Sequence, residues 1–161
     1  MKKILIIGCG GSGKSTFARK LAEKTGLPLH YLDMIWHRSD HTTISQEEFD
    51  TKLEEILKND TWIIDGNYQR TMPRRLQEAD TVFFFDLPVE ACIEGVTNRI
   101  GRQRPDMPWI ENSLDPQFLQ WITNFPTTRL PIIRQLLDNY SGTVIRFTDR
   151  QEANDYINNL S

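Results

Sequence analysis

The sequence predicts an α/β fold in which a parallel, five-stranded sheet is flanked by helices. Short apolar runs alternate with segments of helical periodicity along the 161 residues, a pattern typical of such a fold. These runs are continuously apolar rather than alternating, as expected for strands buried on both faces. The strand candidates are Lys3–Ile7, Leu29–Leu32, Thr61–Ile64, Thr81–Phe85 and Thr143–Phe147.

Helical patterns fill the intervals between these runs. Helices are expected after the glycine-rich loop that follows Ile7, after a capping box at Ser45–Glu48, from Pro73 to about Glu78, from Val89 to about Ile100, from Asp115 onward and after Asp149. Pro126 and Pro131 argue against one straight helix after Asp115. We therefore expect one domain over residues 1–161, with an irregular insertion at about 101–114.

Composition and charge argue against several classes of function. The net charge of −3 and the pI of about 5.6 argue against a protein that coats DNA. The two cysteines do not make a disulfide framework or a C-x-x-C metal motif. The apolar run after Lys2 and Lys3 is too short for a signal peptide, and no run approaches the length of a membrane span. A cytoplasmic protein without membrane contact is expected.

The first chemical landmark is the run Gly8-Cys9-Gly10-Gly11-Ser12-Gly13-Lys14-Ser15, which matches G-x-x-x-x-G-K-[ST] at every fixed position. In such a phosphate-binding loop, or P-loop, glycines let backbone N–H groups and a helix N-terminus face an anion. We expect Lys14 to contact the β- and γ-phosphates of ATP and Ser15 to bind Mg²⁺. The expected nucleotide-binding residues are Gly8, Gly10, Gly11, Ser12, Gly13, Lys14, Ser15, Thr16 and Arg99.

Two aspartates follow strand candidates, at the edge where parallel sheets bind ligands. Asp65 comes directly after Trp62–Ile64 and is expected to help hold Mg²⁺, although Asp-Gly is also a common turn pair. Asp33 ends the second strand candidate. It is expected either to accept the proton of a substrate hydroxyl or to bind that hydroxyl, and the structural alternative is a helix or turn cap.

Arginines cluster where the insertion begins. Arg99, Arg102 and Arg104 fall within six residues, and kinases need movable cations that close over the transferring phosphoryl group. We expect Arg99 and Arg102 to be catalytic, with residues 101–114 forming a lid. A solvated basic turn at a helix end is the alternative. The acceptor is expected to contact Asp33, Arg70, Arg104 and Arg134. A substrate-binding region is expected at about 33–60.

The order of these landmarks resembles the adenylate-kinase-related P-loop kinases, and within them the DNA topology modulation protein family. The segments that carry the resemblance, from Ile4 to about Ile122, are GCGGSGKST, HYLD, WIIDGNYQRT, FFFDLP, NRIGRQRPDMP and LDPQFLQWI. The resemblance implies a P-loop NTPase fold of three layers with a short lid, which uses ATP and Mg²⁺. Arg99 and Arg102 resemble lid-base arginines that contact ATP, and the loop Thr148–Arg150 would lie against the adenine.

One segment departs from the adenylate-kinase pattern. Asp65-Gly66 matches the start of the D-G-F-P-R segment, but Asn67-Tyr68-Gln69 replaces its F-P pair and Arg70 stands two positions later than its arginine. The resemblance therefore does not imply that this protein recognises a nucleoside monophosphate.

These features together predict an enzyme, an ATP- and Mg²⁺-dependent kinase acting on a small acceptor. The acceptor can be a nucleoside, a nucleotide or a hydroxylated metabolite, and the protein is expected to be a monomer or a homodimer. An ATP-binding regulator that affects DNA topology or gene expression is the alternative. The sequence shows no helix-turn-helix signature and no broad basic stripe, which argues against direct DNA binding.

Overall fold

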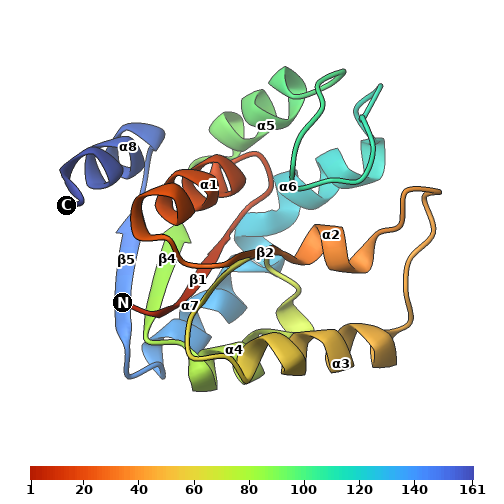
Figure 1. The fold of residues 1–161 in the computed structure, drawn as a ribbon. Helices are drawn as coiled ribbons and strands as arrows, with labels where there is room; N and C mark the ends of the chain where they lie inside the picture. The colour runs from red at the N-terminus through yellow and green to blue at the C-terminus, as the bar shows by residue number, and fades with distance from the viewer.

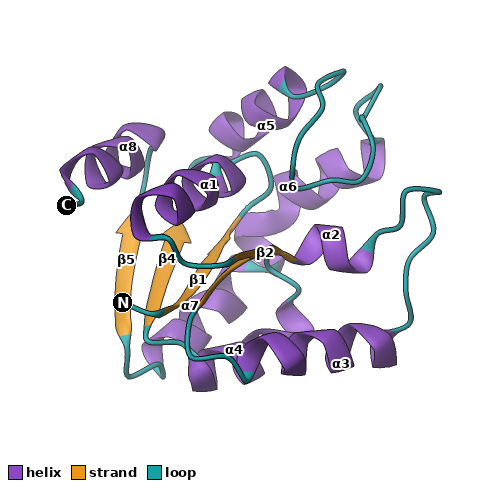
Figure 2. Cartoon of the chain, in the orientation of Figure 1, coloured by secondary structure: helices purple, strands orange, loops and turns teal.

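The computed structural model describes residues 1–161, which form one sheet with helices on both faces (Figures 1 and 2). In chain order the elements are β1 Lys3–Gly8, α1 Lys14–Thr25, β2 Leu29–Tyr31, α2 Leu32–Trp36, α3 Gln46–Leu57, β3 Trp62–Asp65, a 3₁₀ turn Gln69–Thr71, α4 Met72–Glu78, β4 Thr81–Phe85, α5 Val89–Asn98, α6 Pro116–Thr128, α7 Leu130–Asp138, β5 Thr143–Phe147 and α8 Arg150–Asn159.

The five strands are all parallel and lie in the order β2-β3-β1-β4-β5. This arrangement confirms the predicted fold class. Three strands are buried along nearly their whole length, whereas β5 is an edge strand that exposes Thr143, Val144 and Arg146. The expectation of burial on both faces is therefore wrong for β5 and also for β2, the other edge strand, whose three residues are only half-buried. An edge strand has a neighbouring strand on one side only.

Successive residues of β1 point to opposite faces of the sheet and build two separate cores. Ile4 and Ile6 pack in a cluster with residues of α1 and α8, which cover one face. Leu5 and Ile7 pack in the other cluster, with residues of α3 to α7. The sheet is thus the middle of three layers, and the loops after its strands converge at one edge.

Two local features differ from the expectations. The second strand ends at Tyr31, and Asp33 lies in the first turn of α2 instead of ending the strand. Helix α6 continues through Pro126 and ends at Thr128, so the predicted interruption falls at Arg129, just before α7. No helix combines the length and the apolar character that crossing a membrane requires.

Candidate functional site

The loop between β1 and α1 has the backbone that the glycine pattern predicts. Gly11 and Gly13 adopt φ values of 78° and 99°, a region that L-residues rarely enter. A Cβ on Gly11 would lie 2.2 Å from the carbonyl oxygen of Cys92, so α5 approaches this loop too closely for a side chain. The Ser12 hydroxyl is buried and donates to the Cys9 carbonyl at 2.6 Å, which braces the loop from inside.

Lys14 and Ser15 begin α1 and face the edge where the strands end. The Lys14 Nζ donates to the Cys9 carbonyl at 3.2 Å, so the side chain folds back across the loop. The Ser15 hydroxyl donates to Asp65 Oδ2 at 2.7 Å and lies 3.2 Å from Asp106 Oδ2. Asp106 is 91 residues away in sequence and was not predicted as a site residue. Local sequence gave no sign that this carboxylate folds back onto the loop.

Asp65 is a buried carboxyl group with an incomplete set of partners. It is 5% exposed, and its Oδ1 has no hydrogen-bond partner. Burial raises the pKa of Asp65 to about 6, although Lys14 and the bond from Ser15 act in the opposite direction. A hydroxyl and two carboxylates are the oxygen ligands that Mg²⁺ prefers, so Ser15, Asp65 and Asp106 fit such an ion.

Replacing Asp65 by asparagine should stabilise the metal-free protein while weakening its response to Mg²⁺. Because the pKa of Asp65 is higher in the folded state, the carboxyl group lowers stability as the pH rises from about 4 to 6 and then stays unfavourable. Above pH 6 the variant should gain up to about 3 kcal/mol, since one pKa unit corresponds to about 1.4 kcal/mol. Urea unfolding in EDTA at pH 4 and pH 8 measures this: equal stabilities at pH 8 would contradict the prediction.

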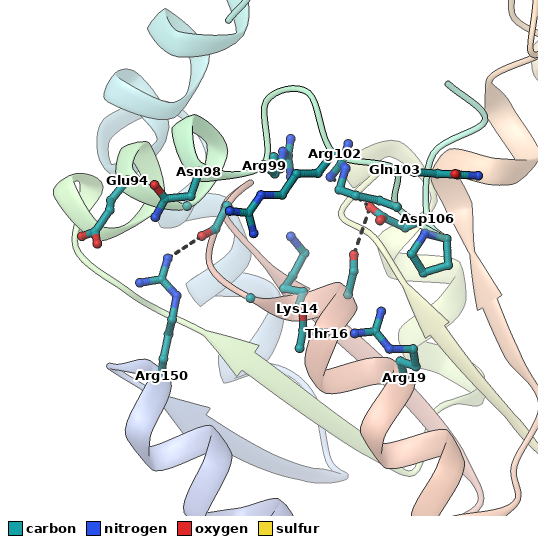
Figure 3. Close-up of a pocket in the computed structure, with 16 residues that line it drawn as sticks. Lys14, Thr16, Arg19, Glu94, Asn98, Arg99, Arg102, Gln103, Asp106 and Arg150 are labelled. Carbon is teal, nitrogen blue, oxygen red and sulfur yellow. Dashed lines mark hydrogen bonds and ion pairs between the residues drawn. The ribbon is translucent and has the colours of Figure 1, made fainter. Parts of the chain in front are cut away.

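A polar cavity of about 560 Å³ lies between the P-loop and the irregular segment after α5. Figure 3 shows Lys14, Arg99, Arg102 and Arg150 around it. The other lining residues are Gly11, Gly13, Ser15, Thr16, Arg19, Glu94, Gly95, Asn98, Gln103, Arg104, Pro105 and Asp106. The three arginines expected at the lid thus line one cavity with the P-loop lysine.

Acidic residues pair with two of these arginines, Arg99 and Arg104. Glu111 pairs with Arg99 at 3.7 Å and also with Arg104, while Arg104 lies 3.3 Å from Asp106. Burial and the neighbouring Arg104 lower the pKa of Arg99. Arg150 donates to the carbonyl oxygens of Gly11 and Ala91 at 2.8 Å. Arg19 was not predicted as a site residue, because it lies on α1 outside any motif. Arg150 belongs to the loop Thr148–Arg150, for which the resemblance implied a contact with the adenine.

A second cavity, of about 330 Å³, lies on the other side of Lys14. Its polar part holds Asp33, whose Oδ1 accepts a hydrogen bond from the Tyr68 hydroxyl at 2.5 Å. Its remaining lining residues are Gly10, Ser15, Tyr31, Asp65, Gly66, Asn67, Gln69, Arg99, Asp106, Phe118, Trp121, Phe125, Arg129 and Ile133. Lys14, Ser15, Arg99 and Asp106 line both cavities.

Two predicted substrate contacts are not part of either cavity. Arg70 forms a two-bond ion pair with Asp50 of α3, at 2.8 and 3.1 Å, on the exposed surface. Arg134 is exposed on α7 and pairs with Asp86 at 3.2 Å. Each pairs with a carboxylate outside the site, and Asp86 also pairs with Arg146, so the structure does not bring either arginine to the acceptor cavity.

Asn67 is a further residue that the motif did not reveal. Its amide oxygen accepts from the Gly8 N–H at 2.9 Å, and its amide nitrogen donates to the Gly8 carbonyl at 2.5 Å. The side chain therefore ties the turn after β3 to the start of the P-loop. Neither Gly8 nor Ser12 lines either of these two cavities, so both support the loop from behind.

Comparisons of sequence give limited similarity. No family model matches the chain. Over 80 residues, half of the chain, the sequence is 30% identical to an adenylate kinase of Thermotoga neapolitana. The matched residues make up 36% of that enzyme, so the chain spans about a third of the length of this relative.

Comparisons of structure extend over nearly the whole chain. A shikimate kinase from Acinetobacter baumannii in complex with shikimate is similar with a TM-score of 0.63 and 20% identity, covering 100% of this chain and 96% of that one. A shikimate kinase from Bacteroides thetaiotaomicron has a TM-score of 0.65 and 18% identity, with 98% and 94% covered. An unliganded sugar kinase from a Janibacter species has a TM-score of 0.54 and 16% identity, with 98% and 91% covered. The chain has the fold of P-loop small-molecule kinases.

Proposed function

We propose that this protein is a phosphotransferase that moves the γ-phosphoryl group of ATP to a small acceptor. The observation that carries the proposal is the meeting of two cavities at Lys14, Ser15, Arg99 and Asp106. An enzyme that transfers a group between two substrates needs two adjoining sites. Its charge-stabilising groups are needed where the two sites meet. The similarity to an adenylate kinase over half of the chain, together with the kinase fold, supports the same reaction class.

The polar cavity fits the triphosphate. The P-loop amides and Lys14 would bind its phosphates, and Arg99 and Arg102 would balance the charge that spreads over the transferring group. Ser15 would hold Mg²⁺ directly and Asp65 would hold it through water. When bound, the ion would neutralise phosphate charge. Asp106 would bring the lid, residues 101–114, next to Ser15 and the ion, so that lid closure and phosphate binding occur together.

The smaller cavity fits the acceptor. Asp33 would orient a hydroxyl group of the acceptor and take its proton, and it is the one residue of the expected substrate-binding region 33–60 that lines this cavity. Closure of the lid would exclude water, which otherwise competes with the acceptor for the phosphoryl group.

Purified protein with Mg²⁺ and ATP should form ADP faster when a suitable acceptor is present. The measurement is coupled ADP release across a panel of nucleosides, nucleotides and hydroxylated metabolites, with phosphorylated product identified by mass spectrometry. A slow ADP release that no acceptor stimulates, with no phosphorylated product, would identify a plain ATPase and contradict the proposal.

The alternative of an ATP-binding regulator of DNA topology has no feature in its favour here, because the second cavity would then have no role. The finer resemblance to DNA topology modulation proteins remains a prediction from the sequence. The same holds for the cytoplasmic location, the monomeric or homodimeric state and the absence of direct DNA binding.

A further inference from the structure

One wall of the second cavity is aromatic. Phe118, Trp121 and Phe125 are spaced by three and four residues on α6, so they share one face of that helix. The rings of Phe118 and Trp121 are stacked, with centroids 5.8 Å apart and an angle of 12° between planes. Phe125 meets the Trp121 ring edge-on at 5.2 Å. A wall of this kind favours a ligand that presents a planar ring.

The polar end of the cavity is built for a hydroxyl group. Asp33 Oδ1 accepts the bond from Tyr68, and no protein group donates to Asp33 Oδ2. The Tyr68 backbone has φ 35°, which is rare for a bulky residue, and its carbonyl accepts a bond from Arg75 at 3.1 Å. The strained turn thus presents the Tyr68 hydroxyl to Asp33, which fixes the carboxylate with one oxygen directed to Tyr68 and the other free to accept from a ligand.

The cavity lacks the cations that an acceptor phosphate needs. Lys14 and Arg99 also line the polar cavity, where ATP phosphates would engage them. The third cation, Arg129, is exposed and donates to the Gln69 side chain at 3.2 Å. Three carboxylates line the same cavity: Asp33, Asp65 and Asp106. Asp65 and Asp106 would face Mg²⁺, so Asp33 is the carboxylate that would repel a phosphate monoester, which carries about −1.5 to −2 charges at pH 7.

Three further arginines near this end of the sheet do not supply positive charge to an acceptor phosphate. Arg70 is held by Asp50, and Arg74 is held by Glu54 and Glu78. Arg75 is fully buried and donates to backbone carbonyl groups, so it is not available to a ligand. Arg129 is therefore the one cation of this cavity that neither the ATP phosphates nor a carboxylate would engage, and a single exposed cation is a poor match for a nucleoside monophosphate.

We infer that the acceptor is an unphosphorylated alcohol attached to a planar ring, either a nucleoside or an aromatic alcohol. The inference rests on the proposed phosphotransfer. The hydroxyl oxygen forms a bond to the γ-phosphorus of ATP as the bond from that phosphorus to the β–γ bridging oxygen breaks. ADP leaves, and the hydroxyl proton passes to Asp33. The planar ring lies against Trp121.

The experiment compares four acceptor classes with Mg²⁺ and ATP: nucleosides, aromatic alcohols, nucleoside monophosphates and saturated polyols. ADP release that depends on Lys14, and product mass, are measured for each. Turnover of one or both ring-bearing alcohols above the other classes is expected, and the two alcohol arms identify which ring is preferred. Preferred turnover of monophosphates or polyols would overturn the inference and leave the phosphotransferase standing. If no acceptor class gave turnover that depends on Lys14, the proposed function itself would be overturned.

Three variants test the same inference on the best acceptor. Asp33→Asn should lower kcat by at least about 100-fold with a smaller change in acceptor KM, since general-base removal acts on the chemical step. Trp121→Leu should raise acceptor KM by roughly 3- to 10-fold with kcat nearly kept, because it removes the stacking surface. Arg70→Gln is the control and should change neither value. A raised acceptor KM in Arg70→Gln, with Asp33→Asn unaffected, would mean that an acceptor phosphate is gripped instead.

Discussion

Replacing Lys14 by alanine should lower the rate of phosphotransfer by at least about 1,000-fold. Lys14 lines both cavities and is the cation at their junction, where charge develops on the transferring phosphoryl group. Its only hydrogen bond to the protein is the one from Nζ to the Cys9 carbonyl at 3.2 Å, so its loss removes little packing. The variant should therefore fold with nearly unchanged thermal stability, and steady-state ADP release with the best acceptor measures the loss.

Lys24→Ala is the matched control for this variant. Lys24 lies in the last turn of the same helix, is exposed and donates to the Leu160 carbonyl at 3.3 Å. The change removes the same charge from α1 at the end far from the P-loop, so the rate should stay within about twofold of the unmodified protein. If both variants retained the same activity, Lys14 would have no special role and the proposed chemistry would lose its main charge-stabilising cation.

The sheet was predictable from the sequence because its strands are marked by continuous apolar runs. The P-loop was predictable because its glycine spacing is dictated by backbone geometry within eight residues. Asp33 was assigned to the wrong element, since nothing in the short run Leu29–Leu32 marks the change from strand to helix after Tyr31. Short apolar runs do not distinguish the last residue of a strand from the first turn of a helix.

The site as a whole depends on contacts that are distant in sequence. Asp106 reaches Ser15 across 91 residues, and Phe118 lies so close to Gly10 that a Cβ there would be 2.7 Å from its ring. Such contacts follow from how the layers pack, and no local pattern encodes them. Local sequence also does not determine which arginines are buried. Arg70 and Arg75 lie in one short segment, yet Arg70 is exposed and Arg75 is fully buried.

Replacing Arg75 by methionine should destabilise the protein by about 3 kcal/mol, the largest stability effect that we expect of a single polar side chain here. Arg75 donates to the carbonyls of Gly66, Asn67 and Tyr68 and to the Thr71 hydroxyl, and burial lowers its pKa to about 9, so it remains charged at neutral pH. Methionine keeps the length and helix propensity of the side chain but cannot donate, which leaves the buried carbonyl oxygens without their partner.

Arg74→Met provides the comparison within the same helix. Arg74 is partly exposed, and its ion pairs with Glu54 and Glu78 lie in solvent, so its loss should cost no more than about 1 kcal/mol. Urea unfolding of both variants gives the difference directly. Because the bonds from Arg75 also hold the turn that carries Tyr68, the folded fraction of Arg75→Met should bind the acceptor more weakly, whereas Arg74→Met should bind it normally. Equal stabilities of the two variants would show that the buried guanidinium does not brace this turn.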